Sequence, residues 1–342
     1  MTITELHKQT VASLKENPSK VAQRRAAIAE LARGNERTLK LDRPTLRRRA
    51  GIWFSTSQGN TFAGKGELCV QLLGVGVGSL VFDESEKRWW FRPTKKGVSS
   101  WRWSNNREDG ALINKYLEAR IVEIRAARQN SRGNEREIQW QLASALSSEK
   151  KIRNRNLRGL RPVSIGGFPL EIGVSVSRNG GVNNRSTGNI DLLLVKRGGS
   201  VGGRMLVLEL KAPGVNKEKS IQGALEQAIR YATALDFEAN GDRDETAEQQ
   251  MNLATYRSAF GLKESGKGWL GLGIVVAMED AGPDFRDAAR KQLNECCREL
   301  GKSPIKWIDI LLYDYDKAGE TADGWRWLEN WSPPSPLRRV GG

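Results

Sequence analysis

The second half of the chain combines two spacings of apolar residues, one typical of strands and the other typical of helices. Short apolar runs predict strands, and longer segments with apolar residues three or four positions apart predict helices. The predicted strands cover 171–176, 190–196, 205–211, 270–278 and 308–313, and the predicted helices cover 111–129, 220–235 and 283–300, with another beginning near Glu135. Strands and helices in this order predict an α/β fold of the α+β kind.

The first third of the chain has a different pattern. Residues 1–50 place apolar positions at near-helical spacing among many basic residues, which predicts a helical leader. Residues 51–108 contain short β-type runs between glycine-rich and charged turns, which predicts a small β-rich module that contains tryptophan. We therefore expect the main α/β domain at 109–332 and a loosely ordered tail at 333–342.

Positive charge is unevenly distributed along the 342 residues. Lys and Arg number 55 against 40 Asp and Glu, which gives a formal net charge of +15. The leader holds 12 Lys and Arg against 5 Asp and Glu, so it supplies +7 of this excess, and it ends on Arg47, Arg48 and Arg49. The excess favours a polyanionic partner, and these arginines are candidates for contacts with a phosphate backbone. A merely basic, solvated surface is the alternative interpretation.

Some residue types are too scarce for common catalytic sites. The chain has one histidine, His7, so a His-containing triad or a histidine metal cluster has almost nothing to build on. Its three cysteines lack the CxxC spacing of zinc sites and do not form a disulfide framework, which favours a reducing cytoplasm. The sequence shows no signal-like start, no apolar run of about 18 residues and no GxxxxGK[ST] motif, so we expect no secretion, no membrane span and no P-loop ATPase.

The most informative segment runs from Asp191 to Lys211. Two apolar runs flank the glycine-rich connection 198–203, which predicts an antiparallel hairpin. In the second strand Glu209 and Lys211 share a face and lie about 6.6 Å apart along the strand axis. Asp191 lies near the start of the first strand, and it is expected close to the second strand because paired strands lie about 4.8 Å apart. Three charged groups are therefore expected to meet at the end of a strand that is otherwise apolar on both faces.

Two carboxylates and an ammonium group suit phosphodiester hydrolysis without histidine. Asp191 and Glu209 offer the hard oxygen ligands that Mg²⁺ prefers, and Lys211 can position or deprotonate a water and neutralise charge on a phosphate. The alternative interpretation is a structural ion pair at a sheet edge. Another Glu-x-Lys occurs at 149–151 in a polar region, so the prediction depends on the placement of these residues and not on the tripeptide.

Together with the segment Gln227-Ala-Ile-Arg-Tyr231, these residues resemble the PD-(D/E)xK nuclease superfamily, particularly members with a Gln-xxx-Tyr helix after the catalytic strand. The resemblance spans about residues 130–315. It implies a restriction-endonuclease-like mixed sheet flanked by helices and Mg²⁺-dependent cleavage of DNA, less often RNA, with Mn²⁺ as a substitute ion and a restriction or defence role. It also implies that Gln227 and Tyr231 steady the lysine, the water or the phosphate, and it makes Arg230 a candidate for contact with nucleic acid. An amphipathic helix with a polar flank is the alternative.

The first motif departs from the family pattern, because Asn189 and Ile190 precede Asp191 without a proline. Such families also place a glutamate on the helix before the sheet. Glu135 shares a helical face with the apolar positions three and seven residues later and is expected to look inward, whereas Glu137 is rotated about 200° away. Glu135 is the better candidate, and a glutamate that simply favours a helix N-terminus is the alternative.

Weaker signals lie outside this segment. Residues 87–103 mix tryptophans with Lys and Arg, a pattern found where single strands or flipped bases are bound, yet core packing is the preferred interpretation. The same preference applies to the C-terminal tryptophans Trp325, Trp327 and Trp331. An acidic group is expected to face solvent without a basic partner: Asp309, Asp314 and Asp316.

The sequence thus predicts a cytoplasmic, Mg²⁺-dependent endonuclease acting on nucleic acid, with Asp191 and Glu209 as metal ligands. A non-catalytic basic DNA- or RNA-binding protein is the rival, and a nuclease-fold assembly subunit that binds a partner protein is a third interpretation. A homodimer is left open. The predicted catalytic residues are Glu135, Asp191, Glu209, Lys211, Gln227 and Tyr231.

Overall fold

The structure is a computed structural model of the chain. The residues that it describes are 2–34, 52–55, 67–104, 107–128, 135–147, 157, 159–165, 168–177, 188–196, 204–215, 217–241, 254–260, 272–300, 304–315, 317 and 324–329. The predictions for Arg47, Arg48, Arg49, Asp316, Trp331 and the tail 333–342 fall outside these residues.

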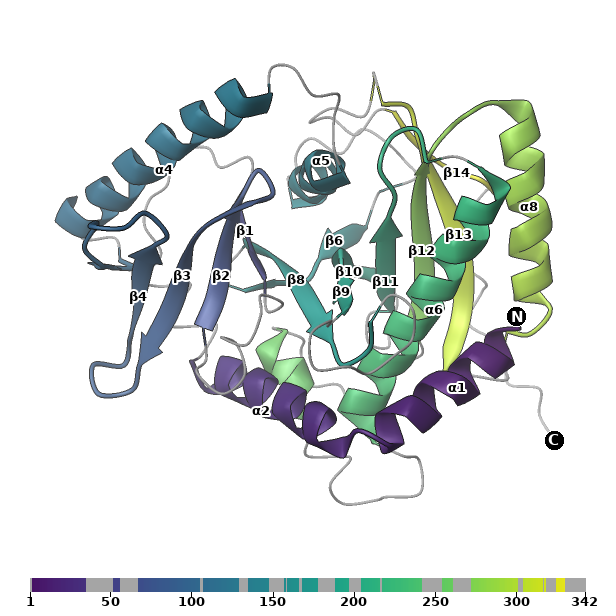
Figure 1. The fold of residues 1–342 in the computed structure, drawn as a ribbon, viewed down its shortest axis with the longest axis horizontal. Coiled ribbons are helices and arrows are strands. Elements are labelled where there is room, and N and C mark those ends of the chain that lie inside the picture. The colour runs from purple at the N-terminus through teal and green to yellow at the C-terminus, as the bar shows by residue number, and fades with distance from the viewer. Residues whose placement is uncertain are drawn as a thin grey trace.

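The first of two sheets is built mainly from the β-rich segment and continues into the rest of the chain (Figure 1). Its strands follow the order β5-β4-β3-β2-β1-β8-β7, and β9 pairs with β8. β1 joins the two parts, because it pairs antiparallel with β2 and parallel with β8. The strands are β1 (Ile52–Ser55), β2 (Glu67–Leu72), β3 (Val75–Asp83), β4 (Arg88–Pro93), β5 (Trp101–Arg102), β7 (Ser164–Ile165), β8 (Phe168–Val174) and β9 (Gly188–Ile190).

The second sheet follows the order β14-β13-β12-β11-β10-β6. β10 and β11 form the predicted antiparallel hairpin, and β11, β12 and β13 are mutually parallel neighbours. The sheet is therefore mixed, and the fold is a mixed α/β fold, as predicted. Its strands are β6 (Leu160–Pro162), β10 (Leu192–Lys196), β11 (Arg204–Leu210), β12 (Leu272–Glu279), β13 (Ile305–Tyr313) and β14 (Trp325–Trp327).

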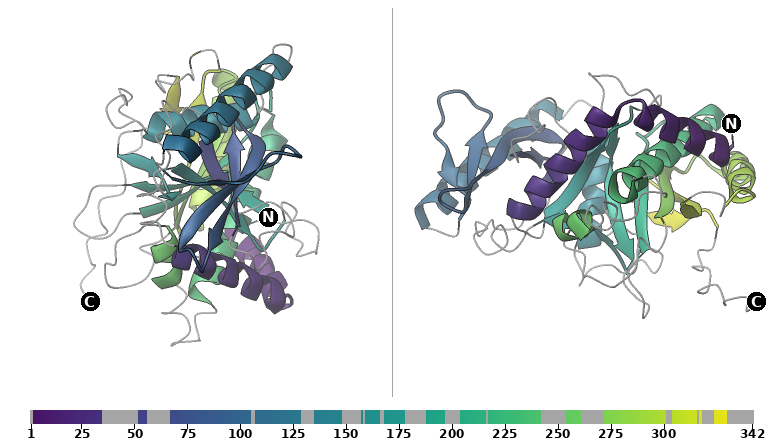
Figure 2. Two further views of the ribbon diagram at one scale, coloured as in Figure 1. Left: turned by 90° about the vertical axis from the view of Figure 1, so that its left-hand side faces the viewer. Right: turned by 90° about the horizontal axis from the view of Figure 1, so that it is seen from below.

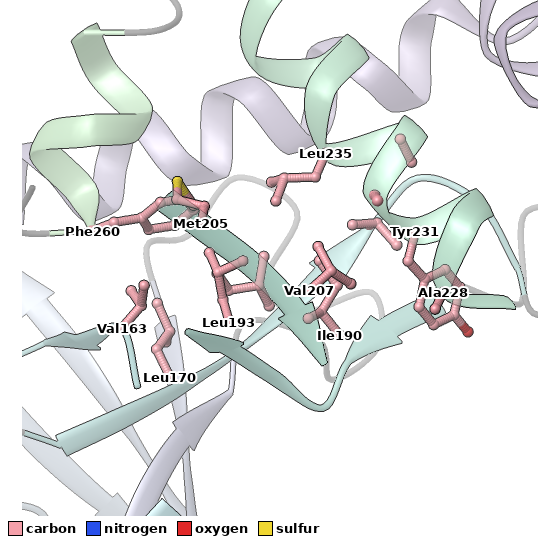
Figure 3. Close-up of a cluster of buried hydrophobic side chains, with 14 of the residues drawn as sticks. Val163, Leu170, Ile190, Leu193, Met205, Val207, Ala228, Tyr231, Leu235 and Phe260 are labelled. Atoms are coloured by element: carbon pink, nitrogen blue, oxygen red, sulfur yellow. The ribbon is translucent and has the colours of Figure 1, made fainter. Parts of the chain in front are cut away.

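Helices cover both faces of the second sheet because the side chains of its central strands alternate between two apolar clusters. Met205 and Val207 of β11 belong to the cluster beneath α6, whereas Leu206 and Leu208 pack with the apolar face of α5. Figure 3 shows the first cluster, with Leu235 of α6 above the strands. The helices are α1 (Ile3–Lys15), α2 (Pro18–Gly34), α4 (Arg107–Arg128), α5 (Glu135–Ser147), α6 (Glu218–Asn240) and α8 (Pro283–Cys297).

One predicted element is divided between the two sheets. The expected strand 190–196 breaks at Asp191, so that β9 pairs with β8 of the first sheet while β10 pairs with β11 of the second. The apolar pattern does not reveal this break, because the residues on both sides of Asp191 are apolar and buried. Asp191 consequently lies where the chain crosses from one sheet to the other.

Most tryptophans of these segments support the prediction of core packing, although Trp101 is only half-buried where it packs against the core. Trp89, Trp103 and Trp325 are almost fully buried, and Trp327 is 7% exposed. Trp103 packs edge-on against Phe54, where it helps to fill the space beneath β1. Trp90, which alternates to the other side of β4, is only half-buried.

The two leader helices pack against α6 (Figure 2). Leu6 and Leu14 of α1 are 1% and 0% exposed, as the helical spacing of apolar residues requires. In α2, Arg25 donates hydrogen bonds to the carbonyl oxygens of Glu238 and Phe237 at the end of α6. The described part of the leader is therefore bound to the main body by apolar and polar contacts.

A buried carboxylate fixes α6 at the same place. Glu238 accepts hydrogen bonds from the backbone N–H of Ser175 (2.7 Å) and from the hydroxyl of Tyr256 (3.2 Å). Burial raises the pKa of Glu238, and the charge of Arg24 in α2 acts in the opposite direction. Arg24, a basic residue of the leader, thus interacts through its charge with the buried carboxylate of Glu238.

No described helix is long and apolar enough to cross a membrane.

Truncating Leu6 to alanine should lower the free energy of unfolding by about 2–5 kcal/mol, because it leaves a cavity between α1 and α6. Lys8→Ala, on the exposed side of the same helix, should change it by about 0.5 kcal/mol or less. Urea unfolding followed by circular dichroism measures both. Equal, small effects would mean that α1 does not contribute to the core.

Candidate active site

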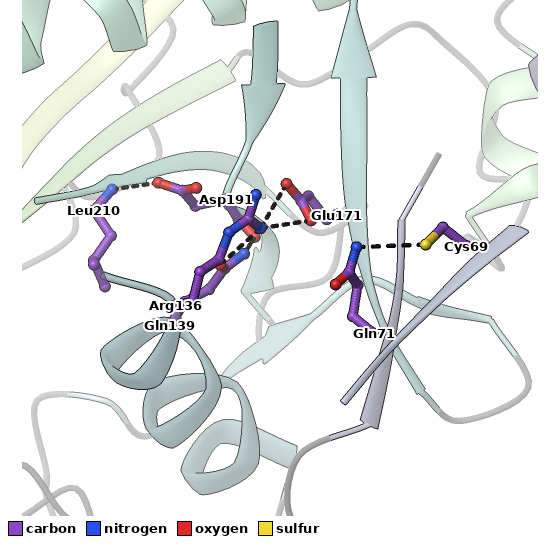
Figure 4. Close-up of polar contacts among 7 residues, drawn as sticks. All are labelled: Cys69, Gln71, Arg136, Gln139, Glu171, Asp191 and Leu210. Atoms are coloured by element: carbon purple, nitrogen blue, oxygen red, sulfur yellow. Dashed lines mark hydrogen bonds and ion pairs between the residues drawn. The ribbon is translucent and has the colours of Figure 1, made fainter. Parts of the chain in front are cut away.

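Asp191 is held in the bend between β9 and β10 by hydrogen bonds at two of its groups. Its Oδ2 accepts a hydrogen bond from the backbone N–H of Leu210 at 2.8 Å, and its carbonyl oxygen accepts one from Nε2 of Gln139 at 2.7 Å (Figure 4). Leu210 lies between Glu209 and Lys211. The first bond therefore fixes the Asp191 carboxylate beside the end of β11, close to the residues predicted to act with it.

Glu209, Lys211, Gln227 and Tyr231 form one chain of hydrogen bonds. Nζ of Lys211 donates to Oε1 of Glu209 at 2.7 Å and to Oε1 of Gln227 at 2.9 Å. Nε2 of Gln227 then donates to the hydroxyl of Tyr231 at 3.1 Å. Gln227 and Tyr231 lie one turn apart on α6, so they present their polar groups on the same side of the helix. All four side chains are at least nine-tenths buried.

A second buried ion pair, which the sequence analysis missed, lies beside Asp191. Nη1 of Arg136 on α5 contacts both carboxylate oxygens of Glu171 on β8, at 3.0 and 2.9 Å (Figure 4). Glu171 is 1% exposed, while the side chain of Arg136 is 36% exposed. The available signal was a charged residue inside an otherwise apolar strand, together with an arginine next to the candidate Glu135.

Like charges surround the Asp191 carboxylate. Burial raises its pKa well above the usual range, and the charges of Glu209, Glu135 and Glu171 raise it further. The hydrogen bond from Leu210 opposes this shift without cancelling it. Asp191 is therefore a carboxylate whose ionised form is disfavoured in the folded protein and would be favoured by a nearby cation.

Arg136 partly supplies such a cation. Burial acts to lower its pKa, but the charges of Glu171, Asp191 and Glu135 and the hydrogen bond to Glu171 together raise the pKa of the guanidinium. The arginine stays charged in any case. It therefore offsets part of the negative charge on the α5 side of the site, whereas Lys211 does so on the α6 side.

The structure brings most of the predicted site residues together. Glu135 is half-buried in the first turn of α5, and its charge reaches Asp191. Glu137 is half-buried on the same helix. Arg230 is half-buried on α6 between Gln227 and Tyr231 in sequence.

No three Asp, Glu, His or Cys side chains among the described residues are grouped so that they could hold a metal ion. The oxygen donors of Asp191 and Glu209 are nevertheless the type that Mg²⁺ prefers. They are close enough for the charge of Glu209 to raise the pKa of Asp191. The chemistry of these two donors fits a hard divalent cation, although Lys211 occupies one oxygen of Glu209.

The acidic group near β13 differs from its prediction. Asp309 is 3% exposed, and burial, with the charge of Glu329, raises its pKa to about 7. Its position inside a strand that is covered by α8 explains the burial. Asp314 is half-exposed as expected, but it has a basic partner, because Nζ of Lys317 lies 3.0 Å from its carboxylate.

Comparisons with protein-family models, with curated proteins and with solved structures find no match for this chain. Its function therefore has to be inferred from its sequence and from the arrangement of its residues.

Replacing Asp191 by asparagine should stabilise the protein at neutral pH. A raised native pKa means that the folded state binds a proton that the unfolded state has released, so wild-type stability falls as the pH rises above the unfolded value, about 3.9. The difference between Asp191→Asn and wild type should thus be near zero below about pH 4 and grow toward neutral pH. Denaturant unfolding at several pH values measures it. A pH-independent difference would contradict the raised pKa.

Gln227→Leu should reduce the free energy of unfolding by about 1–3 kcal/mol, because the buried ammonium of Lys211 loses one of its acceptors. Tyr231→Phe should cost less, about 0.5–1.5 kcal/mol. Gln222→Leu, on the exposed side of the same helix, is the matched control and should have little effect. Urea unfolding compares the three variants, and equal losses for Gln227→Leu and Gln222→Leu would argue against the buried chain of hydrogen bonds.

Proposed function

We propose that this protein is a Mg²⁺-dependent endonuclease of the PD-(D/E)xK type, which hydrolyses phosphodiester bonds in nucleic acid, DNA in preference to RNA, in a restriction or defence role. The observation that carries the proposal is the buried Lys211, which bridges Glu209 and Gln227 beside Asp191. Burying several charges costs stability, and strongly perturbed charged groups cluster at functional sites. A cluster of perturbed carboxylates with a fixed lysine supports hydrolysis of a polyanion.

Asp191 and Glu209 are the residues that would hold Mg²⁺. Both offer carboxylate oxygens, and their mutual repulsion would be relieved by a divalent cation. When bound, Mg²⁺ supplies a Lewis acid for the phosphate and lowers the pKa of a bound water. Mn²⁺, which also binds carboxylate oxygens, is expected to substitute.

Lys211 is the residue placed to act on the reacting groups. Its two hydrogen bonds fix the ammonium at the end of β11, where it can hold the attacking water by a hydrogen bond. The same charge stabilises the negative charge that grows on the phosphate oxygens as the bond from phosphorus to the leaving oxygen breaks. Gln227 positions Lys211, and Tyr231 in turn orients the Gln227 amide. Glu135 assists from the α5 side by its charge.

One observation favours the rival, a basic nucleic-acid-binding protein without catalytic activity. The direct contact of 2.7 Å between Lys211 and Glu209 is also what a structural ion pair would show. In that case the chain would bind nucleic acid with a steep salt dependence and without a metal requirement. The two functions thus differ in their need for metal.

Purified protein should cut plasmid, linear or single-stranded DNA, or RNA, in Mg²⁺ or Mn²⁺ but not in EDTA. Asp191→Ala and Lys211→Ala should lower the rate by about 10²–10⁴-fold, because each removes a group that acts on the transition state. Lys219→Ala, an exposed lysine of α6, is the matched control and should cut as wild type. Failure of the wild type to cut under any metal condition would argue against the enzyme, and full activity of Lys211→Ala would refute its assigned role.

Metal binding can be measured without cleavage. Mg²⁺ should raise the melting temperature of wild type, because a ligand that binds only the folded state stabilises it. Asp191→Asn should lose this shift. An equal shift in both proteins would place the metal elsewhere.

A further inference from the structure

A row of directly paired residues crosses the first sheet and begins at the candidate site. Glu171 of β8 pairs with Ser55 of β1, Ser55 with Cys69 of β2, Cys69 with Ser79 of β3, and Ser79 with Arg92 of β4. Directly paired residues point to the same side of a sheet, so these five side chains share one face. At about 4.8 Å for each strand, the row is about 19 Å long.

The two faces of this sheet differ in their surroundings. On the inner face, Leu68, Leu80 and Phe91 are completely buried, and Tyr116 of α4 packs edge-on against Phe91. On the outer face, the row is buried only at Glu171 and Ser55, and Arg136 of α5 lies against Glu171. Farther along the row, Cys69 and Ser79 are half-buried, and Arg92 is exposed.

An aromatic ring surrounded by arginines lies on the open part of the outer face. Trp90 is half-buried there, and the guanidinium carbon of Arg102 on β5 lies 5.5 Å from the centre of its ring. Arg88 and Arg92 occupy the same face of β4, two positions before and after Trp90, and both are exposed. The neighbouring Trp89 points the opposite way and is 2% exposed, so the outward position of Trp90 is not explained by core packing.

We propose that the exposed part of this outer face, centred on Trp90, binds single-stranded nucleic acid. A partly exposed indole can stack on an unpaired base, and arginines can stack on bases or contact phosphates. A duplex keeps its bases stacked inside, so it offers no base to Trp90. This inference rests on the proposed function, since it specifies the form of nucleic acid that the protein would hold near its site.

Charge complementarity favours this occupant. Two arginines beside Trp90 have acidic partners on the surface: Arg92 contacts Glu67 at 3.5 Å, and Arg102 contacts Glu86 at 3.4 Å. Exposed ion pairs of this kind contribute little, so phosphate groups can replace the carboxylates. The partly exposed guanidinium of Arg136 extends the positive groups to the other end of the row.

The test measures binding in EDTA, so that it does not depend on cleavage. Fluorescently labelled oligothymidylate, its RNA counterpart and a duplex of the same length are titrated with the full-length protein at several salt concentrations. We expect tight, salt-sensitive binding of the single strands and weaker binding of the duplex. Trp90→Ala should weaken single-strand binding about 5- to 100-fold, the range for the loss of one stacked base, and Trp90→Phe should retain most of the affinity. The DNA and RNA strands together show which sugar is preferred.

Two further variants test whether binding depends on the positive charges beside Trp90 or on the positive charge of the protein in general. Arg88→Gln with Arg92→Gln should weaken binding and reduce its salt dependence, whereas Lys291→Gln, an exposed lysine of α8, should not. Wild-type affinity of Trp90→Ala, or equal losses in Lys291→Gln, would overturn the proposal. Self-association of the wild type that Trp90→Ala abolishes would assign the face to a second copy and also overturn it. Binding without cleavage in Mg²⁺ would leave this inference standing and count against the nuclease alone.

Discussion

The hydrogen bond from the backbone of Leu210 to the carboxylate of Asp191 ties together the two sheets of this protein. The chain leaves the first sheet after β9 and enters the second with β10, and Asp191 is the residue between them. Its side chain reaches the end of β11, and its carbonyl is held from α5 by Gln139. The crossing is therefore fixed by polar contacts at the point where apolar packing changes from one sheet to the other. This crossing also determines the geometry of the candidate site, because the same hydrogen bond places Asp191 beside Glu209 and Lys211.

Energetically, the site is a collection of buried charges that are only partly compensated. Lys211 and Glu209 are 5% and 2% exposed and form an ion pair. The Lys211 ammonium also donates a hydrogen bond to the amide oxygen of Gln227. Desolvation of two charges is offset only where hydrogen bonds are good, and apolar residues of the same shape would often be as stable. Asp191, which has like charges around it, adds an unfavourable contribution at neutral pH. Buried charges that lower the stability of the fold are expected at a functional site.

Much of the fold, and part of the site, could be predicted from periodicity. Alternation in β11 placed Glu209 and Lys211 on one face, and helical spacing placed Gln227 and Tyr231 on the same side of α6. The pair of Arg136 and Glu171 could not be found in this way, because its members are 35 positions apart and meet only once α5 has packed against the second sheet. The burial of Asp309 was also missed, since a polar residue inside a strand looks solvent-exposed until the covering helix is known. Periodicity identifies a face, but it does not identify which element covers that face.

The attachment of the leader to α6 has a consequence for synthesis on the ribosome. His7 contacts Thr233, 226 positions later, and Arg25 contacts Glu238, 213 positions later. The apolar sides of α1 and α2 thus stay uncovered until α6, which is made much later, is available. Contacts between such distant segments slow folding and expose hydrophobic surface in the meantime. The same α6 carries Gln227 and Tyr231, so the group around Lys211 is completed only after Tyr231 has been made. A growing chain that has not yet reached Tyr231 therefore cannot contain the assembled group.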